Sequence, residues 1–141
     1  MSSPELESLV RLGGLKREAP SKREFEGLLH SGATRLADAA NTDLALESRF
    51  DLAYNAAHAL ALAALRRSGY RSENRHLVFQ TLAHTLQLPA SVWRVLSKCH
   101  ERRNRAEYEG RLEVNERLVL DLIRAGQEVL DALRLLPPPT E

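Results

Sequence analysis

An arginine interrupts the apolar stripe of one predicted helix in the second half of the chain. Val92, Leu96 and Cys99 recur at helical spacing, and the next position of that stripe holds Arg103. A guanidinium group is costly to bury unless it is paired with an anion or faces water. We therefore expect Arg103 to hold an anionic group in a wet cleft or at an interface. The competing interpretation is an ion pair with Glu107, four residues further along the same helix.

Polar and aromatic residues occupy a second stripe of this helix. The stripe consists of Trp93, His100, Asn104 and Tyr108. Guanidinium groups bind phosphate through paired hydrogen bonds, and imidazole exchanges protons near neutral pH. The second half of the helix is therefore the candidate site, with Arg102 as an additional binding residue. Trp93 is expected to be a core or dimer-interface anchor.

Three further polar residues lie on consecutive turns of an earlier, alanine-rich helix. Asp51, Asn55 and His58 are spaced so that they border its apolar stripe. We expect them to line the same cleft as Arg103. The competing interpretation is a hydrogen-bonded polar seam within the chain or between two subunits.

The sequence favours neither a metal centre nor a bound cofactor. None of the five histidines forms the close helical pair of a zinc site. No phosphate-binding loop, nucleophile elbow or dinucleotide-binding fingerprint is present. Cys99 is the one cysteine, so no internal disulfide can form, and its place in an apolar stripe indicates a packed thiol.

Composition indicates an all-α domain. The 141 residues are 43% hydrophobic, with 26 leucines and 18 alanines but only 13 valines, isoleucines and threonines together. Leucine and alanine favour helices, whereas β-branched side chains favour strands. A net charge of +1 offers no whole-domain attraction for nucleic acid. No apolar run is long enough to span a bilayer, and we expect a cytoplasmic protein.

Periodicity and helix-capping residues predict an up-and-down bundle of four to five helices. Ser21 is expected to cap the second helix in a capping box with Glu24. Gly27 and Gly32 weaken that helix but can let a neighbour approach closely. Its apolar face is expected to comprise Phe25, Leu28, Leu29, Leu36, Ala37 and Ala40. The predicted helices run from Pro4 to Gly13, from Ser21 to Ala40, and over 43–68, 75–86, 91–109 and 112–136.

The chain is expected to divide into three parts. Residues 1–20 form a short N-terminal helix and a linker, residues 21–136 form the bundle, and residues 137–141 form a proline-rich tail. Pro137, Pro138 and Pro139 cannot continue a helix, so the tail is expected to be extended.

The string Arg103-Asn104-Arg105-Ala106-Glu107-Tyr108 resembles the signature of the HEPN family, Arg-Asn-x-x-x-His, with tyrosine in place of histidine. The segment from Phe50 to Leu60 is similar to the long alanine-rich helix of that family, and Gly69-Tyr70 follows as its stop. The resemblance covers roughly residues 21–136.

This resemblance implies a four- to five-helix bundle that dimerises, with the two arginine motifs facing each other across a cleft. In active members the arginine and the histidine cleave RNA without a metal. The family's members include RNA-cleaving toxins and partners of small nucleotidyltransferases, and some carry a tyrosine close to the motif that the partner modifies with AMP. Tyr108, with an ordinary pKa near 10, is a poor proton carrier, and His100 is the residue that would replace it.

Three hypotheses follow. The first is a dimeric HEPN-like module that binds RNA, a nucleotide or a nucleotidyltransferase partner through Arg103, Asn104 and Tyr108. The second is a metal-independent ribonuclease toxin in which Arg103 holds phosphate and His100 or Tyr108 carries the proton. The third is a structural bundle whose polar helix end is a dimer seam. Function belongs to the site rather than to the fold, so the bundle alone does not decide among them.

Overall fold

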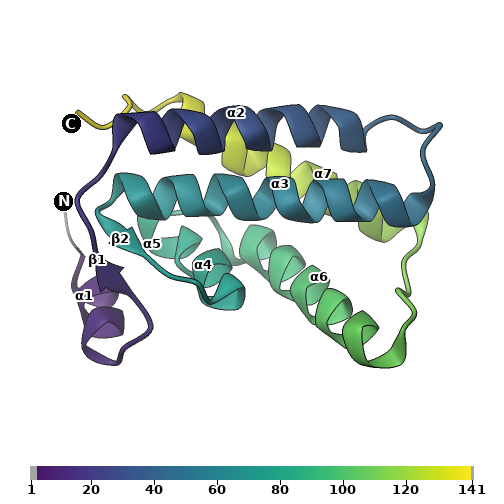
Figure 1. Ribbon diagram of the computed structural model, residues 1–141, viewed down its shortest axis with the longest axis horizontal. Coiled ribbons are helices and arrows are strands. Elements are labelled where there is room, and N and C mark those ends of the chain that lie inside the picture. The colour runs from purple at the N-terminus through teal and green to yellow at the C-terminus, as the bar shows by residue number, and fades with distance from the viewer. Residues whose placement is uncertain (1–2, 141) are drawn as a thin grey trace.

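The alanine-rich helix α3 (Leu46–Arg67) lies at the centre of the fold, and the computed structural model describes residues 3–140. Helices α2 and α7 pack along α3. Helix α6 runs obliquely to α3, and the C-terminal end of α6 lies away from it (Figure 1). The prediction of an all-α helical bundle is confirmed. The other elements are α1 (Pro4–Arg11), β1 (Lys16–Arg17), α2 (Lys22–Ala39), β2 (Tyr70–Arg71), α4 (Arg75–Gln80), α5 (Leu82–Thr85), α6 (Ala90–Glu109) and α7 (Glu116–Arg134).

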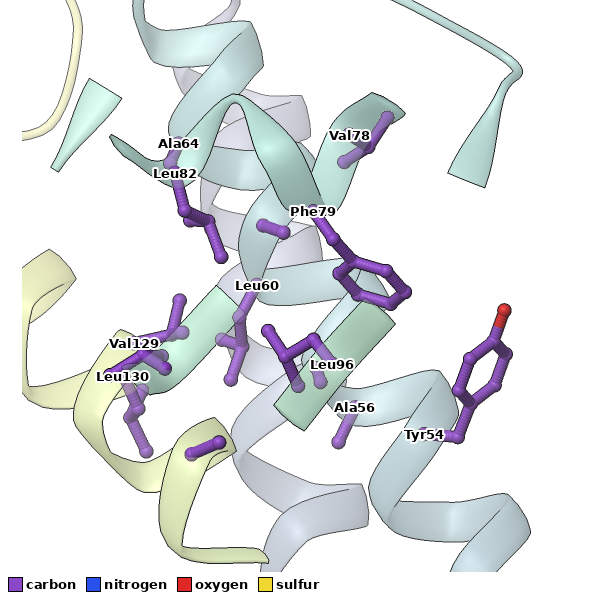
Figure 2. Packing of buried hydrophobic residues seen from close by; sticks show 14 of the residues in the cluster. Tyr54, Ala56, Leu60, Ala64, Val78, Phe79, Leu82, Leu96, Val129 and Leu130 are labelled. Carbon is purple, nitrogen blue, oxygen red and sulfur yellow. The ribbon is translucent and has the colours of Figure 1, made fainter. Parts of the chain in front are cut away.

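Small side chains on α3 let its neighbours approach on several sides. Its alanines are almost all fully buried, and Leu60 on the same helix is also fully buried. Leu96 of α6 and Phe79 of α4 pack against the same cluster as Val129 and Leu130 of α7 (Figure 2). One contiguous apolar core therefore connects α3, α4, α6 and α7.

Three predicted helix boundaries were wrong, and in each case a local hydrogen bond explains the difference. The Asn41 side chain accepts from the Asp43 backbone N–H at 3.0 Å, so this turn lies outside α3. Thr81 donates its hydroxyl to the Val78 carbonyl at 2.7 Å where the predicted helix 75–86 divides into α4 and α5. Asn115 caps α7, which therefore begins at Glu116 rather than at residue 112.

The start of α2 confirms half of the predicted capping box. Ser21 Oγ accepts a hydrogen bond from the Glu24 backbone N–H at 3.2 Å. The Glu24 carboxylate does not return to Ser21; it instead binds Arg66 and Arg71. The apolar face of α2 was also partly wrong, because Ala37 and Ala40 are exposed and Ala39 is buried.

The segment predicted as a linker after α1 contains a short strand. Lys16 and Arg17 of β1 pair antiparallel with Arg71 and Tyr70 of β2. Leu15, just before β1, is buried in the same cluster as the bundle core. The sequence did not indicate this pairing, because a two-residue strand leaves no periodic pattern. No helix within residues 3–140 has the length and apolar character needed to cross a membrane.

The two interior glycines of α2 have different surroundings, and substituting each with alanine is expected to give opposite results. A Cβ at Gly32 would lie 2.5 Å from Leu60 Cγ, whereas a Cβ at Gly27 would meet nothing within 4 Å. Gly27→Ala should therefore stabilise the protein by about 0.5–1 kcal/mol through helix propensity. Gly32→Ala should destabilise it by about 1–3 kcal/mol, because the helices must move apart. Urea unfolding followed by circular dichroism measures both, and equal effects would contradict close packing at Gly32.

Candidate functional site

Arg103 forms an ion pair with another helix rather than with its own. Its Nη1 donates a hydrogen bond to Asp51 Oδ1 of α3, and the two side chains remain 34% and 50% exposed. Both residues line a pocket between α3 and α6, two helices that diverge from each other (Figure 1). The structure therefore pairs Arg103 with Asp51 and not with Glu107, the competing prediction. Arg103 and Asp51 lie together, which both the shared cleft and the competing polar seam within the chain expect.

The ring of Tyr54 lies beneath this ion pair. Tyr54 is only 1% exposed, and the guanidinium carbon of Arg103 lies 5.6 Å from its ring centroid. Figure 2 shows Tyr54 at the edge of the buried cluster, with its hydroxyl directed away from the other labelled residues. Burial raises the pKa of Tyr54 above its ordinary value, despite the opposing charges of Arg75 and Arg103. The phenol is therefore protonated at neutral pH.

Both ring nitrogens of His100 have partners. Nδ1 lies 2.9 Å from the Tyr54 hydroxyl, and Nε2 lies 3.1 Å from the Asn104 amide nitrogen. Burial, followed by the charges of His76 and Arg75, lowers the pKa of His100. His100 is therefore neutral at pH 7 and held in a fixed orientation.

His58 packs on the same phenylalanine, Phe79, as His100. Its Nε2 is buried and has no hydrogen-bond partner among the described residues. Its ring packs edge-to-face on Phe79 at 6.0 Å between centroids. Burial, with the charges of Arg75 and His100, lowers the pKa of His58 to about 4. His58 is thus a neutral residue that packs against Phe79 beside the site.

Asn55 lies between Asp51 and His58 on α3. Its Nδ2 donates to the Asp51 carbonyl at 2.9 Å, and its Oδ1 accepts from Arg75 Nη1 at 3.2 Å. The three predicted α3 residues therefore have different positions. Asp51 borders the pocket between α3 and α6 with Arg103, Asn55 holds Arg75, and His58 is half-buried with its Nε2 in the interior.

The remaining two predicted residues lie away from this cluster. Tyr108 is 90% exposed, and a single chain does not bring it to Arg103. Arg102 donates to the Glu113 carbonyl at 3.0 Å and so fixes the connection into α7. Within residues 3–140, no three histidine, cysteine or carboxylate side chains gather as a metal ion would need.

Two open grooves flank the cluster. The first, here called the α6 groove, has a volume of about 510 Å³. The second, the α3–α6 wedge, has a volume of about 360 Å³ and contains Asp51, Arg103 and Glu107. The α6 groove is lined by His76, Arg94, Lys98, His100, Glu101 and Asn104. His100 and Asn104 therefore face one groove, whereas Arg103 faces the other.

Comparison with known proteins gives no identification. No family model, curated protein or solved structure matches this chain. The resemblance to the HEPN family therefore rests on the residues of the motif and of the alanine-rich helix.

Three residues of the cluster were not among the predicted site residues. They are Tyr54 of α3 and Arg75 and His76 of α4. The rings of His76 and His100 stack at 5.4 Å between centroids with an interplanar angle of 14°. The only sequence signal for Arg75 and His76 as site residues was a cation next to a histidine at the start of a short helix. Such pairs are also common in solvated loops, so the signal does not indicate a site.

Proposed function

We propose that this chain binds single-stranded RNA in the α6 groove and acts as a binding module. The single observation that carries the proposal is the parallel stack of His76 and His100, bordered by Arg94 and Lys98. Flat imidazole rings provide a platform for an unpaired base, and neighbouring cations hold the backbone phosphates. Glu101 is the one carboxylate among the groove residues, so the lining stays positively charged.

Binding is favoured over cleavage by the state of His100. An acid–base catalyst needs a ring nitrogen within reach of the proton that it moves. In this chain Tyr54 and Asn104 occupy both nitrogens, and Tyr108 lies apart from them. The same arrangement suits a rigid recognition surface. An HEPN-like homodimer would carry two such surfaces. Light scattering would measure the mass of the dimer.

The double variant Arg94→Ala/Lys98→Ala is expected to bind a fluorescent oligouridine at least about tenfold more weakly. Each lost phosphate contact should also reduce the salt dependence, so the slope of log K against log salt falls by about 1.4 in total. Fluorescence anisotropy over a salt series measures both quantities. Lys22→Ala/Arg23→Ala removes the same charges from the exposed start of α2 and serves as the matched control.

Equal binding by the two double variants would contradict the proposal. The same reactions, analysed on a denaturing gel, test for cleavage. Oligouridine cut by the wild type, but not by His100→Ala, would make the ribonuclease hypothesis the correct one.

We infer one second candidate from the exposure of Tyr108. Its side chain is 90% accessible, so a partner enzyme could reach the hydroxyl. A nucleotidyltransferase partner that transfers AMP from ATP to the Tyr108 hydroxyl, with release of pyrophosphate, is therefore the competing function. Peptide mass spectrometry of the protein from its native cells would detect AMP on Tyr108, and an unmodified tyrosine there would count against this candidate.

A further inference from the structure

A second arginine lies over the same tyrosine ring as Arg103. Arg75, the first residue of α4, places its guanidinium carbon 5.6 Å from the Tyr54 ring centroid, and the corresponding Arg103 distance is also 5.6 Å. The two cations come from separate elements, α4 and α6, and converge on a side chain of α3. His100 also stacks on Tyr54, at 6.3 Å between ring centroids. The arginine pair therefore adjoins the α6 groove, which His100 and His76 line.

The two arginines differ in how their charge is balanced. Arg103 has the carboxylate of Asp51, whereas Arg75 donates to the neutral amide oxygen of Asn55. In the described part of the chain, no carboxylate lies within 4.0 Å of the Arg75 guanidinium. The uncompensated charge of Arg75 contributes to the lowered pKa values of His58 and His100. Arg75 is thus an exposed, oriented cation that lacks an anion.

We propose that Arg75 is a second phosphate-binding residue, which acts beside Arg103 to hold the backbone of single-stranded RNA as it leaves the α6 groove. This inference rests on the proposed function and names the residues that extend it. A guanidinium has five N–H donors in a planar fork, so Arg75 can keep its bond to Asn55 and still bind a phosphate. Contact with the Tyr54 ring restricts the side chain, which reduces the entropy lost on binding.

Asn55 is the positioning residue in this arrangement. Its amide oxygen orients Arg75 without neutralising it, and its amide nitrogen is fixed to the Asp51 carbonyl. Asn55→Asp would place a carboxylate in contact with Arg75. The anion that Arg75 lacks would then be supplied from within the chain, and an RNA phosphate would have to compete with it.

The test is a salt series of oligouridine binding by anisotropy for the wild type and three variants. Arg75→Ala is expected to lower affinity about tenfold and the salt slope by about 0.7. Asn55→Asp should have a similar effect although Arg75 is still present. Arg75→Lys should keep the slope, because the charge remains, but bind a few-fold more weakly, because an ammonium lacks the planar fork. Arg23→Ala, an exposed arginine of α2, is the matched control.

The outcomes separate this inference from the function that it extends. Wild-type affinity and slope in both Arg75→Ala and Asn55→Asp would overturn the role of Arg75 and leave RNA binding in the groove intact. No binding of oligouridine by the wild type would overturn both proposals. Displacement of the RNA by inorganic phosphate at constant ionic strength would assign Arg75 to a free phosphate ligand and overturn RNA as its ligand. Thermal unfolding of each variant, compared with Arg23→Ala, confirms that folded proteins are compared.

Discussion

Replacing Arg66 with alanine is expected to lower the free energy of unfolding by about 3–5 kcal/mol, because it removes a buried guanidinium that is the donor to several acceptors at once. Arg66 is 1% exposed and donates to the Glu24 carboxylate at 2.6 Å. It also donates to the carbonyls of Glu18, Ala19 and Tyr70 at 2.9, 2.7 and 3.2 Å. One side chain thus joins the end of α3 to the start of α2 and to the segments beside β1 and β2. Alanine would remove the Arg66 donor from the three carbonyls, and the Glu24 carboxylate would keep only Arg71 as its partner.

Arg67 provides the matched control for this experiment. It is the next residue of α3, is only half-buried, and donates to the Pro137 carbonyl at 2.9 Å. Arg67→Ala should lower the free energy of unfolding by less than about 1 kcal/mol, because exposed hydrogen bonds contribute little to stability. Urea unfolding monitored by circular dichroism compares the two variants. A loss at Arg66 no larger than that at Arg67 would show that the buried network contributes little to stability.

Acidification from pH 6.5 to pH 4 is expected to remove up to about 3 kcal/mol of stability through His58 alone. Burial, and then the charges of Arg75 and His100, lowers the pKa of His58 from 6.5 to about 4 in the folded chain. Between these two values the unfolded chain binds the proton and the folded chain does not. Stability is therefore fully present above pH 6.5 and falls as the pH decreases towards 4. The difference between pKa values of 6.5 and about 4 corresponds to about 3.4 kcal/mol in full, of which about 3 kcal/mol is lost by pH 4, where the folded chain is itself half-protonated.

The variant His58→Leu tests this assignment. Leucine removes the titrating group and leaves no unpaired nitrogen in the interior, so the slope of stability against pH should become shallower over this range. His100, whose pKa is also lowered by burial and by His76 and Arg75, should contribute the smaller slope that remains. The control is His30→Leu, at an exposed position of α2. An unchanged slope in His58→Leu would exclude His58 as the source of acid sensitivity.

These two stability predictions concern different parts of α3. Arg66 stabilises its C-terminal end near β1 and β2, whereas His58, in the middle of the helix, packs on Phe79 beside His100. Acid is therefore expected to act first beneath His100, Phe79 and Arg75. A loss of RNA binding at mildly acidic pH would accordingly arise from loosening of α4 against α3.

Helix positions could be predicted from the sequence because their signals are local. The leucine and alanine periodicity of α3, the Ser21 cap of α2 and the stop at Gly110 each involve residues within a few positions of one another. Gly110 ends α6 in the left-handed conformation, at φ 70°. The boundary errors arose where a single Asn or Thr side chain bonded to nearby backbone, which periodicity does not report.

The sequence by itself determined the all-α class and showed that Arg103 interrupts an apolar stripe. Only the tertiary structure decided that Asp51 is its partner, that Tyr54 lies beneath it, and that Arg75 comes to the same ring. The physical reason is that these contacts depend on how α3, α4 and α6 cross. The angles at which these helices cross are set by the packing of the whole core. The contacting residues are 20 to 52 positions apart in the sequence, so no periodic pattern predicts that they meet.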